Sequence, residues 1–328
     1  MSPAFLRAAL AASLLAALQV RPALSQTPQR MHRVAILQLA TAENQRKNEA
    51  AFEQGLRELG YIEGRNLLIE RRYADGRGDR LPALAAELAR TRPDVIFAPT
   101  TPAAHAAKDA SATIPIVIAI ASDPVGSGFA ASLARPGGNV TGTSNIQTEV
   151  DARRVQMLKE MFPKIARVAL VHAGDKLAQL QIAAVRQGGK SLGVEIVSIE
   201  AQRPDDYKSG IAAAKSRSVG AILVVSNAQN GQYRQLIVDL AAEHKLPAIY
   251  PNTEWIEYGG LMSYGAASPL LYYRAAPYVD KILKGAKPGD LPIEQPTRFE
   301  LEINLKTARA LGITIPQSIL VRADKVIE

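Results

Sequence analysis

Hydrophobic and polar positions follow one order twice along this chain, at a nearly constant separation. The runs at residues 33–37 and 167–171 each place an arginine before a short apolar stretch, and a segment of helical period follows both. Further apolar runs and glycine or proline turns then recur in register. The paired landmarks are Arg33 and Arg167, Gly60 and Gly193, Asp94 and Gly220, and Ile114 and Leu246, at offsets of 134, 133, 126 and 132 residues. Four landmarks in one order at nearly one offset predict two lobes of the same design.

Short apolar runs alternate with longer helical patterns inside each half. In the first half, strands are predicted at 33–39, 66–72, 94–97 and 114–120, with helices at 43–59, 81–90 and 102–110. In the second half, strands are predicted at 167–171, 194–199, 221–225 and 248–250, with helices at 150–162, 177–187, 205–216 and 231–244. Strands that are apolar on both faces and alternate with helices indicate parallel sheets with helices on each side. The predicted fold class is therefore α/β, with two Rossmann-like lobes joined by a hinge.

The segments between these patterns indicate where the chain passes from lobe to lobe. Residues 121–138 are rich in glycine and proline and 139–143 are extended and polar, so the first crossing is expected there. A second crossing is expected at 261–264, before a helix at 269–283, and extended pieces follow at 297–303 and 318–325. The N-terminal lobe is then 31–142 plus 266–295, and the C-terminal lobe 143–265 plus 296–328. The lobe of the last segment stays open at this point.

The first 26 residues have the pattern of a secretory signal peptide. Arg7 supplies a positive charge, residues 8–18 are almost wholly apolar or small, and Pro22-Ala23-Leu24-Ser25-Gln26 offers small residues for cleavage. The apolar run is short for a membrane span, and no later stretch reaches that length. The alternative is a buried N-terminal helix. We expect an exported protein that is soluble in the periplasm after cleavage.

Composition narrows the possible chemistry. The chain has 328 residues, of which 47% are hydrophobic and 21% charged, enough for two globular domains. It contains no cysteine, which excludes disulfides, thiolate metal sites and a lipoprotein anchor. The net charge of +8 includes Arg7 and Arg21 of the leader, and the basic residues are scattered, so nucleic-acid binding is not expected. The four histidines lie far apart and no catalytic motif is complete, so we expect no metal, no cofactor and no enzymatic activity.

Polar residues stand directly after the predicted strands of both halves. Ligands of open parallel sheets bind beyond the carboxyl ends of the strands, so these residues should line a cleft between the lobes. Residues near the expected crossings join them. The candidate ligand-binding residues are Gln38, Thr41, Thr100, Thr101, Ser122, Asp123, Thr143, Ser144, Ser226, Asn227, Tyr250, Asn252, Glu254 and Tyr264.

The charged and hydroxyl groups of this set suit a ligand with two opposite charges. Thr100 and Thr101 precede a predicted helix, whose free N–H groups and dipole favour an anion such as a carboxylate. Asp123 and Glu254 could hold an ammonium group. Each also has a structural interpretation: the threonines could cap their helix, and Asp123 could begin a turn.

The aromatic members of the set could cover an apolar ligand body or stack on a cation. They are Tyr250 and Tyr264, to which the neighbouring Trp255 can be added, although Trp255 could equally be a core residue. Together with the charged groups they favour a small zwitterion, such as an amino acid with a sizeable side chain.

Several stretches of the sequence resemble one family. They include Val34-Ala35-Ile36-Leu37-Gln38, Gly60-Tyr61-Ile62-Glu63-Gly64-Arg65-Asn66, Ser122-Asp123-Pro124-Val125, Arg135-Pro136-Gly137-Gly138-Asn139-Val140-Thr141-Gly142 and Gly259-Gly260-Leu261-Met262-Ser263-Tyr264-Gly265. On these stretches the chain resembles the periplasmic substrate-binding proteins of ABC transporters, in the group that includes tryptophan- and aromatic-amino-acid-binding members. The resemblance implies the type I periplasmic-binding-protein fold, with three crossings between two lobes. It also implies cleft positions for Gln38, Thr101, Asp123, Ser144 and Asn227.

The leading interpretation is a monomeric solute-binding component of an ABC importer, which delivers a small molecule to a permease in the inner membrane. A ligand that contacts both lobes would shift an equilibrium between open and closed forms. A protein that presents the solute to a membrane receptor would have the same fold. An exported enzyme with Asp123 and Glu254 as an acid–base pair is a third interpretation. The effector domain of a repressor is less favoured, because a leader stands where a DNA-binding segment would be.

Overall fold

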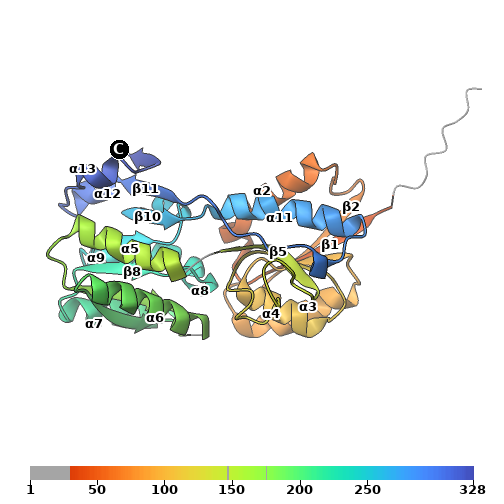
Figure 1. Cartoon of the computed structure of the whole chain (residues 1–328), viewed down its shortest axis with the longest axis horizontal. Coiled ribbons are helices and arrows are strands. Elements are labelled where there is room, and N and C mark those ends of the chain that lie inside the picture. The colour runs from red at the N-terminus through yellow and green to blue at the C-terminus, as the bar shows by residue number, and fades with distance from the viewer. Residues whose placement is uncertain (1–29, 146–147, 175) are drawn as a thin grey trace, which may run out of the picture. The chain divides into compact units, whose positions relative to one another are not determined.

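Two separate sheets, each flanked by helices, make up the computed structural model in Figure 1, which describes residues 30–145, 148–174 and 176–328. The predicted signal peptide, residues 1–26, lies outside the described residues. Within the described part, none of the helices combines the length and the apolar character needed to cross a bilayer. The predicted α/β class with two lobes is confirmed.

The first sheet has five strands, and every neighbouring pair in it is parallel. Their order is β2 (Leu67–Tyr73), β1 (His32–Gln38), β3 (Val95–Phe97), β4 (Ile116–Ser122) and β5 (Val140–Asn145). Its faces are covered by two pairs of helices, α2 (Ala42–Glu58) with α11 (Ser268–Leu283), and α3 (Leu81–Arg90) with α4 (Thr101–Ala110). Helices α2 and α11 lie side by side although residues 59–267 separate them in sequence (Figure 1).

Strand β1 explains why the first sheet needs helices on both faces. Its successive side chains point to opposite sides. Val34 and Ile36 belong to the core under α2 and α11, whereas Ala35 and Leu37 belong to the core under α3 and α4. All four are almost fully buried, so a one-residue shift in register would move each side chain into the wrong core.

The second sheet has seven strands, parallel except where β10 meets β11. Their order is β12 (Lys325–Ile327), β11 (Glu300–Asn304), β10 (Met262–Gly265), β9 (Ala248–Tyr250), β8 (Ala221–Val224), β6 (Arg167–His172) and β7 (Glu195–Glu200). One core contains residues of α5 (Thr148–Met161) and α6 (Lys176–Ser191), and the other contains residues of α7 (Pro204–Ser216) and α9 (Arg234–Glu243). Short helices complete this lobe: α8 (Ala228–Gln232), α10 (Glu254–Glu257), α12 (Leu305–Ala310) and α13 (Gln317–Leu320).

Three of the sequence-based element assignments differ from the structure. The helix predicted at 231–244 is two helices, α8 and α9, which meet at Tyr233. The segment at 261–264 forms β10 inside the second sheet, so the crossing comes after it. The late segment at 318–325 is mostly helix α13 and a turn, because Pro316 starts a helix there and β12 begins only at Lys325.

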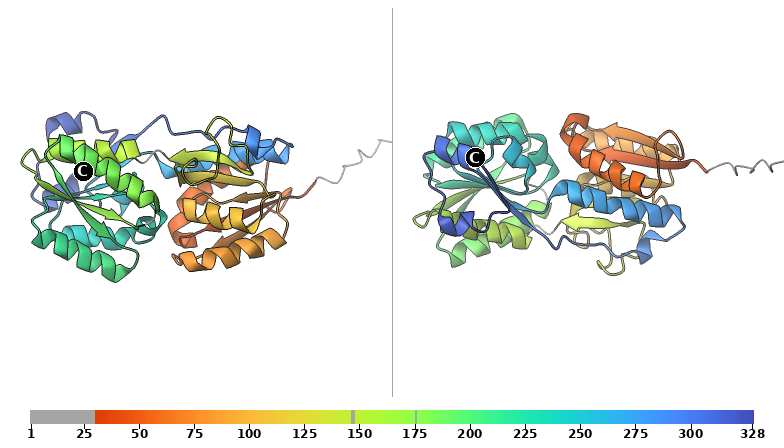
Figure 2. Two further views of the ribbon diagram at one scale, coloured as in Figure 1. Left: turned by 60° about the horizontal axis from the view of Figure 1, so that its bottom comes forward. Right: turned by 90° about the horizontal axis from the view of Figure 1, so that it is seen from above.

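The chain passes between the two sheets three times, as the views of Figure 2 show. The first passage follows the end of β5 at Asn145, and the second follows the end of β10 at Gly265. In the third passage, the chain first lies beside β5, where the N–H of Glu294 donates a hydrogen bond to the carbonyl of Gly142. It then enters β11 in the second sheet. Residues 300–327 therefore lie in the second sheet and its helices.

Candidate functional site

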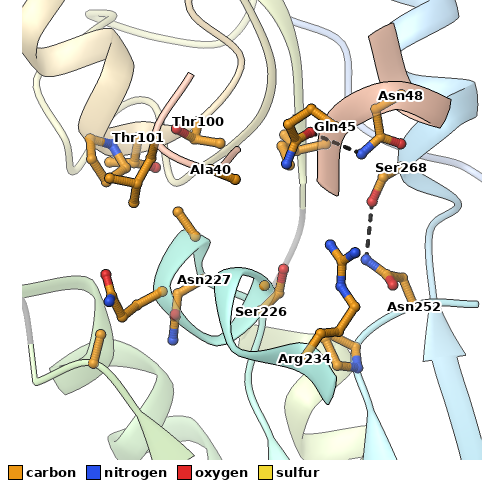
Figure 3. Close-up of a pocket in the computed structure, with 18 of the residues that line it drawn as sticks. Ala40, Gln45, Asn48, Thr100, Thr101, Ser226, Asn227, Arg234, Asn252 and Ser268 are labelled. Atoms are coloured by element: carbon orange, nitrogen blue, oxygen red, sulfur yellow. Dashed lines mark hydrogen bonds between the residues drawn. The ribbon is translucent and has the colours of Figure 1, made fainter. Parts of the chain in front are cut away.

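One cavity of about 230 Å³ opens between the carboxyl ends of the strands of both sheets. Figure 3 shows Thr100 and Thr101 on one side and Ser226, Asn227 and Arg234 on the other. Residues from both lobes line it: Gln38, Leu39, Ala40, Gln45, Asn48, Thr100, Thr101, Pro102, Ile120, Ser122, Ala173, Gln202, Ser226, Asn227, Ala228, Gln229, Gly231, Arg234, Pro251, Asn252, Glu254, Trp255 and Ser268.

Two strand ends and the start of α4 supply one wall of this cavity. Gln38 ends β1 and Ser122 ends β4, where the Ser122 N–H donates to the Thr101 hydroxyl at 3.0 Å. Thr100 stands at the N-cap of α4, but its side chain makes no capping hydrogen bond. Its buried hydroxyl oxygen has no partner within the described part of the chain. The hydroxyl therefore remains available to the cavity at a helix N-terminus, where anions are favoured.

The opposite wall begins where β8 ends. Asn227 caps the short helix α8, because its side-chain oxygen accepts a hydrogen bond from the N–H of Asn230 at 2.7 Å. This bond fixes the amide orientation and leaves the amide nitrogen of Asn227 as a donor. That nitrogen is buried and has no partner among the residues with described positions. Ser226, next to it, also lines the cavity.

Arg234 and Glu254 are the charged side chains among the described residues that line the cavity. The guanidinium Nη2 lies 3.3 Å from the carboxylate Oε2, and both side chains are about nine-tenths buried. The guanidinium also lies over the ring of Tyr258, 5.3 Å from its centroid. Burial raises the pKa of Glu254 above its ordinary value, and attraction to Arg234 is the main effect that opposes this rise.

Helices α2 and α11 contribute polar side chains beside this ion pair. The Asn48 amide donates to the Gln45 side-chain oxygen at 3.1 Å, and both residues come from the first two turns of α2. The Asn252 amide donates to the Ser268 hydroxyl at 3.0 Å, which joins the loop after β9 to the first residue of α11 (Figure 3). The second of these bonds links the two lobes at the edge of the cavity.

Several buried polar atoms on the cavity have no hydrogen-bond partner within residues 30–145, 148–174 and 176–328. They are Gln38 Oε1, Asn48 Oδ1, Thr100 Oγ1, Asn227 Nδ2, Arg234 Nε, Asn252 Oδ1 and Glu254 Oε1. Buried polar groups in folded proteins are nearly always hydrogen-bonded, because an unmet group costs about 1–3 kcal/mol. Their gathering on one cavity indicates a site for a polar molecule that both donates and accepts.

Eight of the fourteen residues predicted from the sequence line the cavity, which are Gln38, Thr100, Thr101, Ser122, Ser226, Asn227, Asn252 and Glu254. Two others serve local turns. Thr41 is the N-cap of α2 and accepts from the Asn44 N–H at 3.3 Å. Asp123 has a φ of 41° and accepts from the Gly126 N–H at 2.9 Å, so it begins a turn, which was its structural interpretation.

The remaining four predicted residues lie in sheets or cores. Thr143 and Ser144 are inside β5, which continues to Asn145, beyond the extended piece predicted at 139–143, and the Thr143 hydroxyl is directed to backbone carbonyls. Tyr250 is buried and stacks on Trp255, with ring centroids 4.9 Å apart. The ring of Tyr264 lies against Phe299. Of the three aromatic candidates, Trp255 alone lines the cavity within the described residues.

Sequence reasoning missed the cavity residues that helices provide, among them Gln45, Asn48, Arg234 and Ser268. The strand-end rule selects positions after strands, so it passes over side chains in the body of a helix. One signal was present. Gln45, Asn48 and Glu49 are polar residues on the face of α2 that should otherwise carry apolar side chains, and all three are buried.

Comparison with known proteins defines the class. A model of the ABC transporter substrate binding protein family matches residues 33–327, and the chain belongs to that family. Its members are solute-binding proteins and not enzymes, as expected from the sequence.

Individual relatives cover most of the chain. A tyrosine-binding protein of Clostridioides difficile strain R20291 is 25% identical over 281 residues, which are 85% of this chain and 81% of the relative. The crystal structure of a conserved domain protein from Vibrio cholerae is similar with a TM-score of 0.85 and 28% identity, covering 90% of this chain and all of that one. An ABC domain from Streptococcus pneumoniae in complex with L-Trp gives a TM-score of 0.84 at 25% identity, with the same coverage.

Proposed function

We propose that this protein captures a small amino-acid-like solute in the cavity between its lobes and delivers it to an ABC permease. One observation supports this proposal above the others. The charged side chains of the described lining are one guanidinium, on Arg234, and one carboxylate, on Glu254, at 3.3 Å from each other. Their charges cancel, so the cavity suits a ligand that carries both charges and is neutral as a whole.

The two charges of an α-amino acid lie close together, so both ends of its head group would meet this pair. The carboxylate would accept hydrogen bonds from Arg234, whose planar guanidinium matches the geometry of a carboxylate. The ammonium group would face Glu254 and the free amide oxygen of Gln38. The ligand carboxylate would then replace part of the contact of Arg234 with Glu254. The ligand ammonium would replace part of the contact of Glu254 with Arg234.

The ligand side chain would extend toward the other end of the cavity. Apolar contacts come from residues such as Leu39, Ile120 and Pro251. The Thr100 hydroxyl and the Asn227 amide nitrogen supply polar contacts, suited to a hydroxyl or a second acceptor group. The tyrosine-binding relative and the complex with L-Trp support an aromatic side chain as the first choice to test.

Isothermal titration with L-tyrosine, L-tryptophan and L-phenylalanine tests this proposal. Each amino acid is compared with the analogue that lacks the ammonium and the analogue that lacks the carboxylate. We expect at least one amino acid to bind and both of its analogues to lose about 30-fold or more in affinity, because each leaves a buried charge unpaired. If no zwitterion binds, the proposed ligand class is wrong.

We also infer that the protein is exported to the periplasm and acts there as a monomer on an inner-membrane permease. The predicted signal peptide and the family support this inference. Mass spectrometry of the protein after expression in a Gram-negative host tests the first part. A periplasmic form that begins near residue 27 is expected, and a full-length cytoplasmic form would contradict export.

A further inference from the structure

A buried hydrogen-bond network lies directly behind the cavity wall at Gln38. The Gln38 amide nitrogen donates to Glu49 Oε1 at 3.0 Å and to the Tyr272 hydroxyl at 3.5 Å. Gln38 and Tyr272 are fully buried, and Glu49 is 6% exposed. Glu49 is not among the described lining residues, and its hydrogen bond to Gln38 connects it to the cavity wall.

Two residues of β2 also contact the Glu49 carboxylate. Its second carboxylate oxygen accepts a hydrogen bond from the Tyr73 hydroxyl at 2.7 Å, and the Nε of Arg71 lies 4.0 Å from the same oxygen. These donors come from the end of β2, the strand that pairs with β1, where Gln38 stands. Both carboxylate oxygens therefore accept a hydrogen bond, one from Tyr73 and one from Gln38. Burial raises the pKa of Glu49, and these two hydrogen bonds and the charge of Arg71 oppose that rise and favour the ionised form.

These contacts allow Gln38 one amide orientation. An ionised carboxylate only accepts hydrogen bonds, so Glu49 must face the NH₂ end of the Gln38 amide. The Tyr272 hydroxyl donates its hydrogen to the Gln45 oxygen at 3.1 Å, so its own oxygen also accepts from that NH₂ group. Both amide hydrogens are thereby committed. The carbonyl oxygen, Oε1, is left on the cavity and is without a partner in the described part of the chain.

We propose that Glu49 is a positioning residue that fixes Gln38 as a hydrogen-bond acceptor and so selects ligands with an N–H donor, an ammonium group, at that point. This inference rests on the proposed function, and it adds a structural cause for the preference for ligands with an ammonium group. Without Glu49, an amide at Gln38 could turn and offer either a donor or an acceptor. A ligand with a hydrogen-bond acceptor in place of its ammonium would then be penalised less, and a ligand with no polar group there, which makes no bond to Gln38, would be affected less than the amino acid.

Glu49→Gln tests this role, because the substituted amide has nearly the same shape but can present either a donor or an acceptor to Gln38. The probes are the best-bound amino acid of the wild-type protein and its desamino analogue, measured by isothermal titration. We expect the affinity for the amino acid to fall about tenfold, as for one lost hydrogen bond to a charged group, and the affinity for the analogue to change less. The ratio of the two affinities should therefore fall. General damage to the site would weaken both and leave the ratio unchanged, and that outcome would overturn the proposal.

The matched control is Glu53→Gln. Glu53 lies on the same helix, one turn further on, and also pairs with Arg71, at 2.6 Å. Within the described part of the chain, Glu49 and not Glu53 accepts a hydrogen bond from Gln38. The ratio of affinities should keep its wild-type value in this variant. A fall in the ratio equal to that of Glu49→Gln would overturn the proposal, because it would assign the effect to Arg71 or the helix.

A double variant, Gln38→Glu with Glu49→Gln, serves if Glu49→Gln alone does not fold. It keeps one carboxylate and one amide in the network, and it places the carboxylate beside the ligand. It should prefer the ammonium ligand at least as strongly as the wild type does, and a lost preference would overturn the inference. If the wild-type protein binds no amino acid, the proposed function fails and this inference with it. If the wild-type protein binds the amino acid more tightly than its desamino analogue, and Glu49→Gln shows the same ratio of affinities, only this inference fails.

Discussion

Two buried arginine–carboxylate pairs in the C-terminal lobe are alike in residue type and differ in how fully they are satisfied. Arg154 pairs with Asp151, and its other nitrogens donate to the carbonyls of Tyr264 at 2.7 Å and Pro251 at 2.9 Å. The second oxygen of Asp151 accepts from Gln181 at 3.1 Å. Every group in this cluster that could carry a charge has a close partner.

The second pair, Arg234 with Glu254, is looser and incomplete. Its shortest contact is 3.3 Å, the bond from Arg234 to the Tyr258 hydroxyl is 3.5 Å, and the Nε of Arg234 has no partner within the described residues. This pair lines the cavity, whereas Asp151 and Arg154 do not. The difference teaches that a buried ion pair has a structural role when all its hydrogen-bonding groups have partners. Donors and acceptors that lack partners at a cavity indicate a binding role.

The largest expected effect concerns the complete pair. In Asp151→Asn, Arg154 keeps its charge in a buried site without its carboxylate, which should cost about 3–5 kcal/mol of unfolding free energy. The comparison is made at pH 7, where Asp151 is ionised because burial raises its pKa only to about 6. Urea denaturation followed by circular dichroism measures the loss. The exposed pair of Asp205 and Lys208 provides a control, since Asp205→Asn should leave the midpoint nearly unchanged.

An unchanged midpoint in Asp151→Asn would remove the distinction between the two pairs. The cluster joins α5 to the carbonyls of Pro251 and Tyr264, next to the point where the chain leaves the second sheet. A destabilised variant that still binds ligand when folded would sharpen the comparison, because it would separate the stability of the lobe from the chemistry of the cavity.

Sequence reasoning found the strands and the cavity residues that follow them, because both depend on local pattern and topology. Gln38 and Ser226 could be placed on the cavity from the rule that ligands bind at the carboxyl ends of parallel strands. The sequence repeat predicted two lobes, because each copy has the same alternation of strands and helices and can form its own core. These inferences need no knowledge of side-chain contacts.

The errors arose where tertiary contacts decide a residue's place. Thr143 and Ser144 were predicted on the cavity, but both lie in β5, which continues to Asn145 because Ser144 and Asn145 pair with β4. Tyr250 follows the same pattern as a cavity residue, yet it fills the core against Trp255. Arg234 could not be chosen from sequence, because nothing local separates it from the many solvated arginines of this basic chain.

The next expected effect concerns the incomplete pair. Arg234→Gln should weaken amino-acid binding by about 30-fold or more, because Glu254 and the ligand carboxylate would both lose their cationic partner. Its effect on unfolding should be smaller than that of Asp151→Asn, since the pair has fewer bonds to lose. Isothermal titration and urea denaturation of the same preparation measure both. The exposed Arg203→Gln serves as control, and a large loss of stability without loss of affinity would place Arg234 with the structural pair.

A smaller, graded effect is expected from acid. Burial raises the pKa of Glu254, so its carboxylate takes up a proton at a higher pH than an exposed glutamate does. Ammonium binding needs the ionised form, which is present above this raised pKa and is lost as the pH falls through it. Affinity should therefore decrease as the pH is lowered from 7 toward 5, and Glu254→Gln should flatten this dependence. An equally steep profile in that variant would assign the titration to another group.

The smallest effect is expected from an exposed ion pair that joins the lobes. Lys47 on α2 pairs with Glu257 on α10, and both side chains are more than half exposed. Water and salt screen such a pair, so Lys47→Gln should change ligand affinity by less than about twofold. Titrations at low and high salt compare it with Arg234→Gln. If removing Lys47 cost as much affinity as removing Arg234, lobe contacts at the surface would control binding, and the distinction between complete and incomplete buried pairs would no longer explain it.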